Sequence, residues 1–232
     1  HNGITYLRYD DSNPEKESEE YIRAIEDDVK WMGFSPAKIT FASDYFDQIL
    51  NFAHQLIKND KAFVCKLSKE AAKDLKDRKL PSPYRNNSIT QNQTEFDKMI
   101  CGEYDENEAV LRAKIDFKHD NPSLRDPAIY RVKKHLHPRT GSRFYVYPLY
   151  DFVHPLCDSI EDISHSLCTL EFENRRELYY WSLEAIGLFK SHVWEYSRLN
   201  ISHNLLSKRK IATLIQKGAV EGWDDPRLLT IK

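Results

Sequence analysis

Two adjacent carboxylates, Asp10 and Asp11, follow residues 4–9, whose β-branched and aromatic side chains predict a strand. In open parallel sheets, ligands bind beyond the carboxyl ends of the strands, and a carboxylate placed there can hold an ammonium group. The alternative is an acidic pair at the start of a helix, which the positive end of the helix dipole stabilises. The residues alone leave both interpretations open.

A basic run near the end of the chain, Ser207-Lys208-Arg209-Lys210, stands between a predicted strand and a predicted helix. A flexible loop with several cations can neutralise the charge that develops on a triphosphate while its bonds rearrange. A run of four such residues is also typical of a solvated basic turn. The run therefore indicates a phosphate site only if other residues support it.

Tyr150 and His154 follow another predicted strand, residues 144–147, and offer neutral hydrogen-bond donors and acceptors that suit a polar, uncharged ligand. Aromatic residues at strand ends are also common in cores. Cys168 follows His165 by three residues, and a cysteine beside a histidine could provide a thiolate nucleophile. Proximity in sequence does not establish contact, so an inert, buried cysteine is the alternative.

Composition excludes several classes of protein. The chain has 232 residues, 41% hydrophobic and 30% charged, which is the balance of a globular protein. None of the four cysteines lies in a C-x-x-C pair, so we expect no structural metal and reduced thiols, as in the cytoplasm. There is no apolar stretch of membrane-spanning length, no secretory signal and no glycine-rich phosphate-binding signature, and we expect no membrane partner. With a net charge of −2, any nucleic-acid surface must come from uneven placement of charge.

Strands and helices alternate at the beginning of the chain, which favours a parallel, doubly wound sheet. The first strand is followed by a predicted helix with Asn13 as its N-cap and Pro14 as its first residue. Its apolar stripe is Tyr21, Ile22, Ile25, Val29 and Met32. A second strand, residues 38–42, precedes a helix capped by Asp44 whose apolar stripe runs from Phe46 to Ile57.

The middle third has a different pattern. We predict a short strand, a charged helix, a loop and two more strands, at 62–67, 68–79, 80–87, 109–117 and 127–134. No clear helix separates the later strands, which suggests a mixed or antiparallel insert. Alternation then resumes, with a strand, helix, strand, helix and strand predicted near 144–147, 150–160, 165–170, 174–188 and 193–201. Residues 205–232 hold the basic loop and one short helix.

Several segments together resemble the glutaminyl- and glutamyl-tRNA synthetases. Residues 7–17 are similar to the R-F/Y-D-D-T-N-P stretch of that family. Further matching segments, 147–152, 165–172, 194–200, 206–210 and 223–227, follow in the order of the family. The resemblance covers nearly the whole chain, and several motifs in register are specific.

The resemblance implies a class I synthetase catalytic domain: an α/β fold whose Rossmann-like parallel sheet is interrupted by a mixed α+β insert that binds the tRNA acceptor end. We expect residues 1–43 in the first part of the catalytic domain, 44–147 in the insert, 148–204 in its second half, and 205–232 in the signature loop and the start of a helical subdomain that contacts the stem. The first class I signature of the family, P-x-P-N-G-x-x-H-I-G-H, does not occur in these residues. From this we expect the catalytic domain to be truncated and this piece to be inactive alone.

The resemblance also implies roles for individual residues. Ser207 and Lys208 match the second class I signature, with Lys208 stabilising the pyrophosphate leaving group, and ATP would also contact Arg198 and Leu199. Glutamine would lie against Asp10, Tyr150, His154 and Cys168, with His154 orienting the amide through water. Asn174 stands where family members read the acceptor stem of the tRNA. ATP with Mg²⁺, glutamine and the tRNA acceptor stem and 3′ end are the expected ligands of a monomeric enzyme.

The choice between glutamine and glutamate depends on few residues. Glutamyl enzymes of the eukaryotic type carry Arg at the position of Cys168, and a neutral cysteine offers no cation for a carboxylate. Val193 stands where glutaminyl enzymes usually have Gln, and residues 194–200 are at least as common in glutamyl relatives. We favour a glutamine–tRNA ligase. The alternatives are a glutamyl-tRNA synthetase and a non-catalytic module that binds a tRNA stem or a partner.

Overall fold

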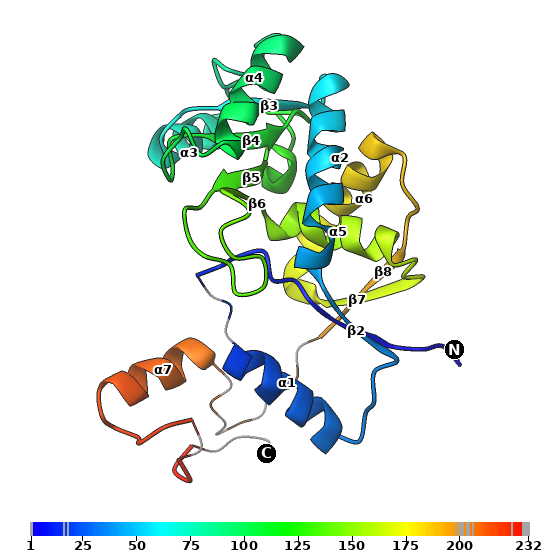
Figure 1. Ribbon diagram of the computed structural model, residues 1–232, viewed down its shortest axis with the longest axis vertical. Helices are drawn as coiled ribbons and strands as arrows, with labels where there is room; N and C mark the ends of the chain where they lie inside the picture. The colour runs from blue at the N-terminus through cyan, green and yellow to red at the C-terminus, as the bar shows by residue number, and fades with distance from the viewer. Residues whose placement is uncertain are drawn as a thin grey trace.

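The computed structural model describes residues 2–15, 17, 19–197, 199, 202, 205, 207–223 and 225–228, with the backbone alone for Lys208. Its helices and strands occur in the order β1 (Tyr6–Tyr9), α1 (Glu19–Trp31), β2 (Lys38–Phe41), α2 (Phe46–Lys58), β3 (Ala62–Cys65), α3 (Lys69–Asp77), α4 (Ile89–Ile100), β4 (Val110–Ala113), β5 (Ala128–Val132), β6 (Val146–Pro148), α5 (Tyr150–Ile160), β7 (His165–Thr169), α6 (Arg176–Ile186), β8 (His192–Tyr196) and α7 (Lys208–Gln216). Figure 1 shows the strands β3–β6 with α3 and α4 at one end, and α1 and α7 at the other. No helix in these ranges combines the length and apolarity needed to cross a bilayer.

Two parallel strand pairs confirm the predicted α/β class. β1 pairs with β2, Tyr6 opposite Lys38, and α1 connects them. β7 pairs with β8, His165 opposite His192, and α6 connects them. Within the described ranges these are two separate two-stranded ladders, whereas a single parallel sheet was expected.

Between the two parallel pairs, β3, β4, β5 and β6 form an antiparallel sheet in that order. The expected antiparallel character of this region is therefore confirmed. Helix α4, which packs on β3 and α2, was not predicted. The sequence does contain a helix-start signal at this point: Ser88 and Gln91 have capping-box spacing, and in the structure they form the reciprocal hydrogen bonds of that motif. The boundaries of the expected domains remain a prediction.

Helix α2 joins the antiparallel sheet to the rest of the molecule. Its predicted apolar stripe is confirmed: Phe46, Ile49, Ala53, Leu56 and Ile57 are buried. The helix contacts α4 and β3 on one side and α6 on another, as its central position in Figure 1 suggests. The antiparallel sheet and the helices around it consequently share one apolar core, whose buried residues come from the sequence between Ala42 and Val193.

Several predictions about local structure are wrong. Asp44 does not cap α2, whose N-cap is Tyr45. The first long helix begins at Glu19, and Asn13 caps no helix, since its side-chain oxygen is buried without a hydrogen bond. The apolar stripe of α1 has no buried residue, and Met32 is 54% exposed. The basic run is also not a free loop. Ser207 caps α7 by accepting from the amide of Lys210, so Lys208, Arg209 and Lys210 form the first turn of that helix.

Candidate active site

An open cleft of about 1160 Å³ lies between β1, α5 and the strands β7 and β8. Four of the residues that the sequence singled out line it together: Asp10, Tyr150, His154 and Cys168. They come from the end of β1, the first half of α5 and the end of β7. The volume exceeds the usual range for small-molecule sites, about 300–1,000 Å³, so the cleft can hold a ligand larger than an amino acid.

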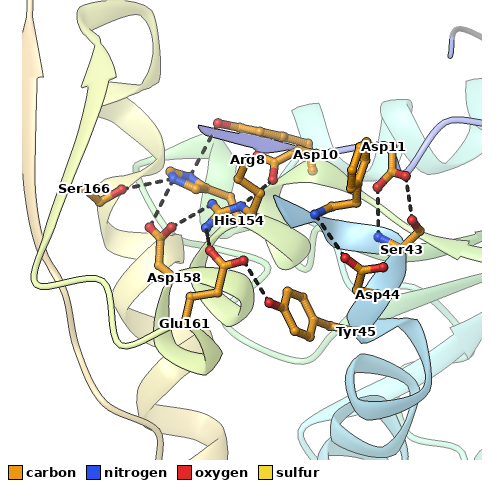
Figure 2. A network of polar contacts seen from close by, with 12 residues as sticks. Arg8, Asp10, Asp11, Ser43, Asp44, Tyr45, His154, Asp158, Glu161 and Ser166 are labelled. Carbon is orange, nitrogen blue, oxygen red and sulfur yellow. Dashed lines mark hydrogen bonds and ion pairs between the residues drawn. The ribbon is translucent and has the colours of Figure 1, made fainter. Parts of the chain in front are cut away.

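Asp11 does not face this cleft, although it adjoins Asp10. It is buried, and its carboxylate accepts from the amide of Ser43 at 2.8 Å and from the hydroxyl of Ser43 at 2.6 Å. Burial raises the pKa of Asp11, while the two bonds from Ser43 oppose that rise. The backbone oxygen of Asp11 also lies 2.6 Å from Nε2 of His137. Asp11 therefore fixes the turn after β2, and Asp10 is the carboxylate that can meet a ligand (Figure 2).

Arg8 lies at the centre of a cluster of carboxylates along one wall of the cleft (Figure 2). Its Nε is 2.8 Å from Oδ1 of Asp10, its Nη2 is 2.6 Å from Oδ1 of Asp158, and its Nη1 is 3.0 Å from Oε2 of Glu161. Tyr45 donates its hydroxyl to the other oxygen of Glu161 at 3.0 Å. One guanidinium thus faces three carboxylates. The surplus negative charge suits the ammonium group of a ligand, and Asp10 is the most exposed of the three.

Three side chains one helical turn apart on α5 form a second set of contacts. Nε2 of His154 is 3.2 Å from Oδ2 of Asp158 and 3.1 Å from Oγ of Ser166, and Nδ1 of His154 is 3.5 Å from the hydroxyl of Tyr150. Burial would raise the pKa of Asp158, but the hydrogen bond and charge of His154 and the charge of Arg8 hold it well below its usual range. An ionised Asp158 only accepts hydrogen bonds, so Nε2 of His154 carries a proton.

The other ring nitrogen of His154, Nδ1, lies 3.5 Å from the hydroxyl of Tyr150 and accepts from it when the ring proton is on Nε2. The ring of Tyr150 is stacked on that of His154, with 5.3 Å between centroids. Burial, and secondarily the charge of Asp10, raises the pKa of Tyr150, so its hydroxyl stays protonated. The Tyr150 proton can therefore point to His154, which leaves the phenolic oxygen as an acceptor at the cleft.

Cys168 is half-buried between the cleft and a smaller inner pocket. Burial raises the pKa of the Cys168 thiol, and the neighbouring Glu195 raises it further. His165 lies on the opposite face of the strand, since residues three apart alternate. The structure thus does not support the Cys–His nucleophile, and Cys168 presents a neutral thiol.

Two of the four residues expected to bind ATP, Leu199 and Ser207, are described by the structure. Leu199 is exposed and Ser207 is the cap of α7; neither lines the cleft. Arg198 and the side chain of Lys208 lie outside the described residues. Asn174 is exposed in the 3-10 turn Leu170–Arg175, where an outside partner can reach it. The described residues contain no group of three or more side chains able to hold a metal ion.

Arg8, Asp158, Glu161 and Ser166 were missed by the sequence analysis. The spacing of Tyr150, His154 and Asp158, four residues apart, could have indicated the face of α5 that they share. Arg8 carries no such local signal, because Asp158 on α5 and Glu161 just after it lie about 150 residues further along the chain.

The parallel strand pairs, the antiparallel sheet between them and the cleft at the strand ends define an α/β ligand-binding catalytic domain. Similar solved structures agree on the fold. A glutamate tRNA ligase from Elizabethkingia meningosepticum superposes with a TM-score of 0.60 at 17% identity, covering 91% of this chain and 46% of that chain. A glutamate-tRNA synthetase from Elizabethkingia anophelis gives the same TM-score and identity.

All 232 residues match the family described as tRNA synthetases class I (E and Q), catalytic domain, and the chain belongs to that family. The predicted family and fold class are thus confirmed. Similar proteins include a probable glutamine–tRNA ligase of Dictyostelium discoideum, 49% identical over 99% of this chain, and a glutamine–tRNA ligase of Pseudomonas putida, 46% identical over 99%. The chain spans 29% of the first of these relatives and 41% of the second.

Proposed function

We propose that this chain forms the amino-acid-binding part of a glutamine–tRNA ligase. In the reaction, the carboxylate of glutamine attacks the α-phosphorus of ATP to give glutaminyl-adenylate and pyrophosphate. The 2′-hydroxyl of the terminal tRNA adenosine then takes the aminoacyl group. The names of the relatives support glutamine as the substrate. The observation that carries the proposal is the chain of contacts from Tyr150 through His154 to the buried, ionised Asp158.

This chain of contacts favours an amide over a carboxylate. An ionised Asp158 makes Nε2 of His154 a donor, His154 then accepts the proton of Tyr150, and the phenolic oxygen accepts from the ligand. An amide NH₂ can donate to that oxygen, whereas a carboxylate cannot. The neutral thiol of Cys168 provides no cation at the same end of the cleft. A glutamate side chain would therefore bury a charge without a partner, which costs several kcal/mol, of order 2–5.

The other end of the substrate fits Asp10. An α-ammonium group placed between Asp10 and the Arg8 cluster would meet the surplus of negative charge described above. The cleft remains large enough for an adenylate beyond the amino acid. Positioning and charge stabilisation account for most catalysis in reactions of this class, so no protein nucleophile is needed.

ATP binding is assigned to Ser207, Lys208, Arg198 and Leu199 on the family resemblance. Bound ATP with its Mg²⁺ supplies the phosphoryl electrophile, and Lys208 supplies a cation for the leaving pyrophosphate. For tRNA, the exposed Asn174 is the proposed contact to the acceptor stem, with residues 44–147 as the domain that holds the acceptor end. We place a monomeric protein in the cytoplasm, as the name of an Arabidopsis thaliana relative supports.

Charging assays test the proposal. The protein expressed from its complete reading frame should charge tRNA with glutamine and strongly prefer glutamine to glutamate. Equal or better use of glutamate would identify a glutamyl enzyme. Tight binding of acceptor-stem RNA without charging of either amino acid would identify a non-catalytic module.

A further inference from the structure

An ion pair stands directly beside Cys168 on the sheet. Glu195 of β8 is the register partner of Cys168 of β7, so the two side chains lie next to each other on the same sheet face. Nε of Arg176 is 2.8 Å from Oε1 of Glu195, and Nη2 of Arg176 contacts the other carboxylate oxygen. The Glu195 side chain is 2% exposed and that of Arg176 is 45% exposed. The arrangement is a two-bond pair with a buried carboxylate and an accessible guanidinium.

This pair lines the inner pocket, which adjoins the proposed substrate site. Tyr150, His154 and Cys168 line both the open cleft and the inner pocket, whereas Arg176 and Glu195 line the inner pocket. A ligand end that reaches Cys168 from the cleft is therefore at the boundary with the pocket that Arg176 lines. Burial raises the pKa of the Cys168 thiol most, and the Glu195 carboxylate raises it further. The Arg176 guanidinium lowers the same pKa by a smaller amount.

An unpaired arginine in this pocket would favour binding of a carboxylate, which an enzyme specific for glutamine must reject. A free guanidinium binds carboxylates with two parallel hydrogen bonds. Here the Nε and one Nη are already engaged by Glu195. The pair also brings no net charge to the pocket, so a carboxylate ligand gains nothing there.

We propose that Glu195 is a specificity-determining residue, which keeps Arg176 in a closed ion pair and so denies a carboxylate-ended substrate a cation beside Cys168. The proposal rests on the proposed glutamine specificity and deepens it. Glu195 touches neither the substrate nor ATP, and it acts through Arg176. Removing its charge frees a guanidinium, whereas removing both charges restores a neutral pocket.

The test uses the protein from its complete reading frame and measures kcat/KM for glutamine and for glutamate in tRNA charging. Glu195→Gln should raise the use of glutamate relative to glutamine by about tenfold, the size of one charge-assisted hydrogen bond. The change should appear as a lower KM for glutamate, because it concerns ground-state binding. The double variant Glu195→Gln/Arg176→Gln should return the ratio to the wild-type value. Asp47→Asn, which frees Arg143 in an exposed pair far from the pocket, is the matched control and should leave the ratio unchanged.

An unchanged ratio in folded Glu195→Gln overturns the proposal, and so does a raised ratio that the double variant fails to reverse. If Glu195→Gln does not unfold cooperatively, the variant is not properly folded, and Arg176→Gln tests the proposal in its place. It leaves the Glu195 carboxylate unpaired and should reduce glutamate use below that of the wild type, and an unaltered ratio contradicts the role of the pair. A wild-type protein that does not prefer glutamine contradicts the proposed function itself, which separates the two failures.

Discussion

Nε2 of His154 lies 3.2 Å from Oδ2 of Asp158, one turn further along α5. Asp158 is nearly inaccessible, and its other oxygen contacts Arg8 at 2.6 Å. One buried carboxylate thus links the strand that carries Asp10 to the histidine that orients Tyr150. The wall that would hold the ammonium group and the wall that would recognise the amide share this residue.

Asp158→Asn should weaken both walls. The amide can donate to His154, so Nε2 no longer needs a proton and the direction of the hydrogen bonds is lost. We expect kcat/KM for glutamine to fall by roughly 10- to 100-fold, as for misplacement of a positioning group. Discrimination against glutamate should fall as well. Charging assays with both amino acids measure this, and unchanged discrimination would show that the tautomer of His154 is fixed by Ser166 instead.

The same substitution should lower stability. Arg8 keeps its ion pairs with Asp10 and Glu161 but loses its ion pair with the buried Asp158. We therefore expect the free energy of unfolding to fall by about 1–3 kcal/mol. Urea denaturation of the 232-residue chain measures it. Asp77→Asn, which breaks an exposed pair with Lys73 on α3, is the control and should leave the midpoint unchanged.

Cys168→Arg should reduce glutamine use and raise the relative use of glutamate, by adding a cation at the end of the cleft. The structure limits the effect of this single change. The new guanidinium would lie beside Glu195 and can pair with it instead of with the substrate. Cys168→Arg combined with Glu195→Gln should therefore shift the glutamate-to-glutamine ratio of kcat/KM further than either substitution alone. Cys168→Ser, which adds no charge, is the control, and a shift of the same size in that variant would point to packing rather than charge.

Glu95 should contribute to the loss of stability that the folded chain shows as the pH falls below 4.5. Hydrogen bonds from Lys66, Tyr104 and Lys98 lower the pKa of Glu95 from 4.5 to about 2. Because the folded chain binds this proton less readily than the unfolded chain, the contribution is complete above pH 4.5 and disappears as the pH falls towards 2. Glu95→Gln should thus flatten the fall of the thermal midpoint in that window. The exposed Glu20→Gln on α1 should behave as wild type, and equally steep limbs in all three proteins would refute the assignment.

Gly102→Ala should destabilise the fold through two effects. Gly102 has φ of +77°, and an added Cβ would lie 3.0 Å from Cδ2 of Tyr145. The left-handed backbone costs about 1–2 kcal/mol for alanine, and the contact with the ring adds to it. Gly187→Ala has φ of +83° with no atom within 4 Å of the added Cβ, so it measures the backbone cost alone. We expect a larger loss of unfolding free energy at Gly102; equal losses would mean that the Tyr145 ring moves away freely.

The sequence predicted the parts of this site that local rules control. Asp10 was expected at the end of a strand, and Tyr150 and His154 after the strand that precedes α5, and all three line one cleft. The apolar period of α2 was equally clear and is buried as expected. These predictions hold because strand ends and helix faces are set by neighbours in the chain.

Contacts over long separations could not be predicted in this way. Nothing near Arg8 indicates three carboxylate partners, since Asp158 lies on α5 and Glu161 directly after it. The pairing of Arg176 with Glu195 joins the start of α6 to β8, and it depends on how the helix packs against the strand in the folded chain. The start of α1 was misplaced because Asn13, a favourable cap residue by type, makes no capping hydrogen bond in the folded chain.

The apolar core shared by residues between Ala42 and Val193 determines whether the expected insert can be deleted or folded separately. The expected insert is contiguous in the chain, yet its sheet and the helices α2, α5 and α6 bury one another's apolar faces. Deleting residues 62–148 would expose Phe152 and Leu156 of α5, and the excised sheet would lose its cover in turn. The expected insert and the rest of the domain should therefore fold as one unit, and both should exchange their most protected amide hydrogens through the same global opening.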